Sequence, residues 1–212
     1  MRSYTMWFYG LCTVGLLSYQ ASAHAETTPM QKTHTQPTQN TAARASWRGN
    51  FDDDSELFTL DGYRLLRYRS PTPTQHEQAI TLSTAELVNL LKQNPSVALL
   101  DVQPLVWKDG FFIQKEPRLH IPGSHWTPNV GQGELEDSWA DYFLRNLQEI
   151  TQGQQDYPVV IYCTADCWMS WNAIKRAKEW GYSHLYWYRD GSDGWQEADL
   201  DTAEGVPARF SH

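Results

Sequence analysis

The stretch Pro158-Val159-Val160-Ile161-Tyr162, followed by Cys163-Thr164-Ala165-Asp166-Cys167-Trp168-Met169-Ser170-Trp171, decides which fold this chain can adopt. The first five residues form a short apolar run typical of a buried strand, and the residues after Cys167 follow a helical pattern that ends at Gly181. A strand, a tight turn with a thiol and a helix are how an α/β domain presents a nucleophile. The N–H groups at the start of that helix point at whatever the thiol holds, and a thiol in this position ionises more easily.

The neighbouring segments alternate between helix and strand patterns, and this alternation predicts an α/β domain. We expect three layers, with a mainly parallel central sheet and helices on both faces. The predicted helices start at a capping box at Ser83, at Asp137 or Ser138, after Cys167, and near Gly191. The predicted strands cover 97–102, 158–162 and 184–188, and residues 121–126 are predicted to form a turn and a short strand. A loop is predicted from Gln103 to His120. In such a sheet Asp101 and Cys163 meet at one edge, because the strands end there.

The beginning of the chain has a different composition. Arg2 precedes an apolar stretch from Met6 to Leu17, and the small residues around Ala25 follow the pattern of a signal-peptide cleavage site. An N-terminal anchor is the alternative, although the stretch is short for a membrane span. We therefore divide the chain as follows: signal peptide, 1–25; disordered linker, 26–46; N-terminal extension that packs on the domain, 47–80; main domain, 81–212.

Composition narrows the classes of function. The 212 residues include 41% hydrophobic residues and ten tryptophans, which suits one domain with one core. A net charge of −8 argues against nucleic acid as a partner, and no apolar run in the body of the chain is long enough to span a membrane. Cleavage of the signal peptide would leave Cys163 and Cys167 as the only cysteines, in an oxidising, periplasmic compartment.

Several motifs in a fixed order resemble the landmarks of a rhodanese-like domain over about residues 81–200. They are Leu99-Leu100-Asp101-Val102, His120-Ile121-Pro122-Gly123-Ser124, Val159-Val160-Ile161-Tyr162-Cys163, Gly181-Tyr182 and Asp193-Gly194-Trp195. Within that family the Cys-x-x-x-Cys-Trp-Met-Ser-Trp-Asn run is similar to a narrower group of exported proteins. Those proteins are associated with alcohol catabolism that depends on pyrroloquinoline quinone (PQQ).

The resemblance implies a rhodanese-like fold and assigns roles to residues. Cys163 takes the position of the persulfide-forming cysteine, and Asp101 takes that of a structural aspartate that braces the active-site loop. The loop residues implied are Thr164, Ala165, Asp166, Trp168, Met169 and Ser170. The implied partners are a PQQ-dependent alcohol dehydrogenase system or its periplasmic cytochrome or transport components. A link to the PQQ pathway is the one cofactor connection that the resemblance suggests, and no metal is implied.

The loop departs from the family pattern in its charge. Many sulfurtransferases place an arginine or lysine in the loop, whereas this chain has Asp166 there. We expect this carboxylate to oppose thiolate formation at Cys163 and to repel thiosulfate. Lys175 and Arg176 lie on the following helix, too far along to replace a cation in the loop.

The cysteine pair is open to several chemical interpretations. In the first, Cys163 attacks or carries sulfur and Cys167 resolves the intermediate as a disulfide, which makes the protein a thiol redox or sulfur-transfer protein. In the second, the pair is a structural disulfide, and the protein is a non-enzymatic periplasmic binding protein that holds a quinone cofactor or alcohol metabolite through an exposed Trp168 ring. In the third, the two cysteines are free thiols and bind a metal together with His120 or His125.

Overall fold

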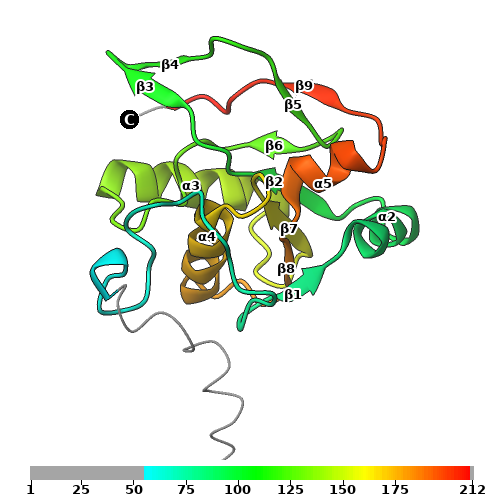
Figure 1. The fold of residues 1–212 in the computed structure, drawn as a ribbon, viewed down its shortest axis with the longest axis horizontal. Coiled ribbons are helices and arrows are strands. Elements are labelled where there is room, and N and C mark those ends of the chain that lie inside the picture. Colours follow the sequence, from blue (N-terminus) through cyan, green and yellow to red (C-terminus); the bar gives the residue numbers. More distant parts are fainter. Residues whose placement is uncertain (1–54, 211–212) are drawn as a thin grey trace, which may run out of the picture. The chain divides into compact units, whose positions relative to one another are not determined.

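A five-stranded parallel sheet forms the centre of the computed structural model, which describes residues 55–210 (Figure 1). Its strands stand in the order β1 (Ile80–Leu82), β8 (Leu185–Tyr188), β7 (Val159–Tyr162), β2 (Ala98–Asp101) and β6 (His125–Trp126). Each neighbouring pair is parallel. The expected signal peptide and linker, and the start of the expected extension, lie outside the described residues. In the described part, no helix is long and apolar enough to cross a membrane.

Helices cover both faces of this sheet, as the alternating pattern predicted. They are α2 (Thr84–Gln93), α3 (Asp137–Thr151), α4 (Trp168–Glu179) and α5 (Gly191–Glu197). Strand β7 shows why two cores form, because its side chains alternate between faces. Val159 and Ile161 belong to the core beneath α3 and α4, whereas Val160 and Tyr162 belong to the core beneath α2 and α5 (Figure 1). The three-layer α/β prediction is confirmed.

The ends of the helices test the capping predictions. Ser83 and Glu86 form the predicted capping box at the start of α2. The prediction that Asp137 or Ser138 caps α3 is wrong, because Glu136 is the capping residue and makes no side-chain cap bond. Asp137 lies instead in the first turn, where a negative charge is favourable beside the positive end of the helix dipole.

The segment from 103 to 120 is not the single loop that was predicted. It contains β3 (Val106–Lys108) and β4 (Phe111–Ile113), an antiparallel hairpin, and β5 (Arg118–His120), which pairs with β9 (Ala203–Gly205). These strands of three residues are too short for periodicity to reveal them. The hairpin turns at Asp109 and Gly110, both with positive φ, and the Asp-Gly pair is the available turn signal.

The segment before β1 runs beside α4 and the end of β7 (Figure 1). It begins with a short 3-10 helix, η1 (Ser55–Leu57), and has little regular structure afterwards. An isolated β-bridge joins Arg69 to Cys167. The backbone N–H and carbonyl of Arg64 both form hydrogen bonds with the side-chain amide of Asn172. We call residues 64–72 the strap.

Candidate functional site

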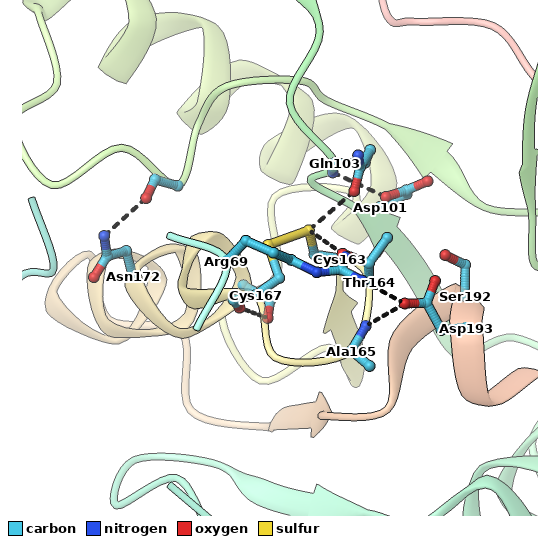
Figure 2. The surroundings of a disulfide bond; sticks show 12 residues. Arg69, Asp101, Gln103, Cys163, Thr164, Ala165, Cys167, Asn172, Ser192 and Asp193 are labelled. Atoms are coloured by element: carbon cyan, nitrogen blue, oxygen red, sulfur yellow. Dashed lines mark hydrogen bonds and ion pairs between the residues drawn. A yellow bond between two sulfur atoms is a disulfide. The ribbon is translucent and has the colours of Figure 1, made fainter. Parts of the chain in front are cut away.

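Cys163 and Cys167 lie at the two ends of the turn between β7 and α4, and a disulfide joins them (Figure 2). Their Cα atoms are 6.2 Å apart, within the range that disulfides adopt. Cys163 is 0% exposed and Cys167 is 5% exposed. The predicted turn therefore brings the two sulfurs together, but it holds them beneath other groups.

The turn is shorter than the loop that the resemblance implied. Thr164, Ala165 and Asp166 form it, and Asp166 has a positive φ of 50°, which an aspartate tolerates better than most residues. Met169 and Ser170 belong to the first turn of α4 instead. Both are buried, and the Ser170 hydroxyl donates to the carbonyl of Cys167 and accepts from the Trp187 indole. The chemistry of the turn therefore rests on fewer residues than expected.

Trp168 does not have the exposed ring that the ligand-binding interpretation requires. It is 2% exposed, and it packs edge-on against Phe58 and Trp171, with ring centroids 5.4 and 5.5 Å away. Its Nε1 donates to the hydroxyl of Ser70, 3.1 Å away in the strap. A ring held in this way is part of the packing between α4 and the strap, and its face is not open for a flat ligand.

Asp101 lies at the carboxyl end of β2, where the sequence placed it, and it is fully buried. Its two oxygens accept hydrogen bonds from Arg118 at 2.9 and 3.1 Å. Arg118 then donates to the hydroxyl of Ser192 at 2.9 Å and to the carbonyl of Cys163 at 3.5 Å. This chain of contacts supports a bracing role for Asp101, because it holds the backbone of Cys163 without touching the sulfur.

Gln103 contacts the sulfur directly, and sequence reasoning missed it. Its Oε1 lies 3.2 Å from Sγ of Cys163 (Figure 2). The register of the sheet explains the contact: Asp101 pairs with Tyr162, so the residues just beyond them leave the sheet side by side. That register was the available signal, since Gln103 follows Asp101 by two residues at the end of a neighbouring strand.

The charges around the turn differ from the expectation based on Asp166. Its carboxylate forms an ion pair with Arg189 at 3.1 Å and accepts from the backbone N–H of Thr72 at 3.3 Å. We expected Asp166 to oppose thiolate formation at Cys163, and the structure adds a cation, Arg189, that offsets its charge. A second arginine, Arg69 of the strap, contacts the Thr164 hydroxyl and pairs with Asp193 at 2.9 Å (Figure 2).

The N–H groups at the start of α4 are not all available, contrary to the expectation from the strand–turn–helix pattern. The N–H of Trp168 donates to the carbonyl of Tyr68 at 2.8 Å, and the N–H of Ser70 donates to the carbonyl of Asp166 at 3.0 Å. The strap thus pairs with the turn as a short piece of antiparallel strand. The strap therefore occupies the N–H of Trp168, one of the groups that were expected to face a bound anion.

The two histidines named for a metal site have other neighbours. Nδ1 of His120 lies 3.5 Å from Asp101, and Nε2 of His125 lies 2.6 Å from Oδ1 of Asn146. Across residues 55–210 there is no group of three histidine, cysteine or acidic side chains placed to hold a metal ion. Two surface pockets, of about 300 and 320 Å³, are lined by residues outside the cysteine turn.

Tyr162 precedes Cys163 and does not act as an acid in this environment. Burial, and then the charge of Asp101, raise the pKa of Tyr162 well above its ordinary value. Its hydroxyl accepts from the N–H of Ile121 at 3.2 Å and lies 2.6 Å from the Ser124 hydroxyl. Tyr162 therefore stays neutral and fixes the turn that leads into β6.

Comparison with known proteins agrees with this architecture. Residues 83–198, more than half of the chain, match the family model of the rhodanese-like domain. No match was found among curated proteins. Similar solved structures include a thiosulfate sulfurtransferase from Pseudomonas aeruginosa, at 18% identity and a TM-score of 0.44, covering 63% of this chain and 22% of that one.

Two further structures are of the same kind. The polysulfide-sulfur transferase homodimer from Wolinella succinogenes has 17% identity and a TM-score of 0.39, over 64% of this chain and 85% of that one. The 3-mercaptopyruvate sulfotransferase from Escherichia coli has 16% identity and a TM-score of 0.41, over 61% and 52%. The fold and the family match lead to one assignment: the chain belongs to the rhodanese-like domain family.

Proposed function

We propose that this protein transfers sulfur or thiol redox equivalents through Cys163, with Cys167 as the resolving thiol. The observation that carries the proposal is the disulfide between them, at the turn that follows β7 in a rhodanese-like domain. Cys167 is the N-cap residue of α4, and a thiol within disulfide reach of Cys163 can close on it.

The proposed cycle has three steps. The Cys163 thiolate attacks the outer sulfur of a persulfide or polysulfide donor, whose S–S bond breaks so that the donor leaves as a thiolate. The Cys167 thiolate then attacks Sγ of the Cys163 persulfide, and the outer sulfur leaves as hydrosulfide while the disulfide forms. A dithiol reductant returns the pair to two thiols and is itself oxidised to a disulfide. The oxidised pair in this structure corresponds to the product of the second step.

A structural disulfide is the second candidate, and the burial of the pair favours it. Cys163 has no exposed surface, and the strap lies over the turn. A donor reaches the sulfur only if a group that covers the turn, such as the strap or Gln103, moves. If it does not move, the disulfide would stabilise the domain by constraining its unfolded state and would take no part in chemistry.

Mass measurement on cysteine variants separates these candidates. The reduced Cys167→Ser variant is treated with polysulfide, and its intact mass should rise by one sulfur atom that thiol reductants remove. The matched Cys163→Ser variant should gain nothing. If polysulfide treatment adds no mass to either variant, and the disulfide of the unaltered protein reduces only below about −300 mV, sulfur transfer is rejected and the structural role is supported. A potential above roughly −230 mV is expected for a working pair.

We propose further that the protein is exported and serves periplasmic alcohol oxidation that depends on PQQ. The Cys-x-x-x-Cys-Trp run and the signal-peptide pattern in residues 1–25 support this proposal. Cell fractionation and the intact mass of the mature chain test the first part, with cleavage expected after Ala25. Deletion of the gene should slow growth on alcohols while growth on sugars is unchanged, and equal growth on both would contradict the second part.

A further inference from the structure

The side-chain amide of Gln103 is the group that meets the Cys163 sulfur from the neighbouring strand (Figure 2). We propose that Gln103 is a catalytic residue that stabilises the thiolate of Cys163; this rests on the proposed function, in which Cys163 is the reacting thiol. The contact of 3.2 Å between Oε1 and Sγ places the amide within hydrogen-bonding reach of the sulfur.

The backbone N–H and the backbone carbonyl of Gln103 both form hydrogen bonds. Its N–H donates to Oδ1 of Asp101 at 2.9 Å, and its carbonyl accepts from Nε1 of Trp126 at 2.8 Å. Both partners are buried. The side chain therefore starts from a rigid position, and the amide reaches the sulfur without ordering a loop.

An amide suits a sulfur that changes its protonation state. A thiol donates its proton to the amide oxygen, whereas a thiolate accepts a hydrogen bond from the amide nitrogen, and a half-turn about the last side-chain bond exchanges the two. A carboxylate in the same place only accepts, and an aliphatic side chain does neither. The amide bonds to both forms of Cys163, but a hydrogen bond to the charged thiolate is roughly twice as strong as one to the neutral thiol, so the amide of Gln103 favours ionisation of Cys163.

The charged groups around Cys163 are mutually paired, which leaves this role to a neutral donor. The ionisable side chains on the surrounding elements are Asp101, Arg118 and His120 at the ends of β2 and β5, Asp166 in the turn, Arg69 in the strap, and Arg189, Asp190 and Asp193 after β8. Asp101 pairs with Arg118, Asp166 and Asp190 with Arg189, and Asp193 with Arg69. Each carboxylate near the turn thus has a cation beside it.

The test measures the ionisation of Cys163 directly. In the reduced full chain carrying Cys167→Ser, the ultraviolet absorbance of the thiolate is followed against pH, with the chain that carries both Cys163→Ser and Cys167→Ser as the baseline. Gln103→Glu is nearly isosteric and places an acceptor-only group on the sulfur, so we expect about tenfold less thiolate near neutral pH, or one unit in pKa. Gln103→Met removes the donor without adding charge and should raise the pKa by a smaller amount.

The control is Gln148→Glu, which makes the same change at an exposed position of α3 and should leave the titration unchanged. An unchanged thiol pKa in Gln103→Met would overturn the proposal, whether or not Gln103→Glu folds. This readout does not depend on sulfur transfer. A shifted pKa in a protein whose Cys163 never accepts sulfur would reject the proposed function alone, and sulfur loading with an unshifted pKa would reject the role of Gln103 alone.

Discussion

Replacing Asn172 with alanine should loosen the strap and destabilise the domain. Asn172 is fully buried in α4, and its amide makes three hydrogen bonds. Oδ1 accepts from the N–H of Arg64 at 2.9 Å, and Nδ2 donates to the carbonyls of Arg64 and Gly131, both at 2.8 Å. At about 1 kcal/mol for each neutral bond, Asn172→Ala should lower the free energy of unfolding by about 3 kcal/mol.

Two measurements check this value. Urea denaturation followed by tryptophan fluorescence gives the free energy of unfolding, and hydrogen exchange reports the strap alone. The Arg64 amide should exchange roughly fivefold faster in Asn172→Ala, because the one bond of about 1 kcal/mol to its acceptor is gone. The matched control, Asn89→Ala on the exposed face of α2, should change stability by less than about 0.5 kcal/mol. If Asn172→Ala loses less than about 1 kcal/mol and the Arg64 amide keeps its protection, our account of the strap is wrong.

Three further predictions concern other buried groups. Burial lowers the pKa of His76 from 6.5 to about 4, so the unfolded chain alone takes up a proton between those values. The free energy of unfolding should therefore fall by about 3 kcal/mol as the pH drops from about 6.5 to 4, and denaturation at several pH values should show a smaller fall in His76→Gln. Asp101→Asn leaves the Arg118 guanidinium without its charged partner and should cost about 3 kcal/mol in urea denaturation; an unchanged midpoint would contradict the bracing role. Gly131→Ala would place a Cβ against the backbone carbonyl of Met169 and should cost about 3 kcal/mol in the same assay, whereas a stable variant would show that α4 can shift.

The sheet and its helices were predictable because their signals are local. The apolar run that ends at Tyr162 and the capping box at Ser83 each specify an element from a few neighbouring residues. Strand β1 and the strands between 103 and 120 gave no such signal, since a strand of three residues cannot show a period. Their place depends on partners far along the chain, such as β8 for β1 and β9 for β5.

In the candidate site, too, the residues that follow from local patterns were predictable, and the contacts between distant segments were not. Asp101 and Cys163 were predictable as neighbours because both follow buried strands of one parallel sheet. The partner of Asp166 was not predictable, since Arg189 lies 23 residues away and reaches the turn only after β8 has joined the sheet. The turn alone therefore does not reveal the cation that offsets Asp166, and the contacts of Arg69 were hidden for the same reason.

The residues that follow Cys167 in the Cys-x-x-x-Cys-Trp-Met-Ser-Trp-Asn run have a structural role in the packing of α4. Trp168 and Asn172 bind the strap through Ser70 and Arg64, and Ser170 accepts from the indole of the buried Trp187. These side chains point into packing, and the run after Cys167 holds the strap against the turn. Under the proposed function, in which Cys163 is the reacting thiol, variants of Asn172 and Trp168 should therefore alter its reactivity without changing the sulfur itself.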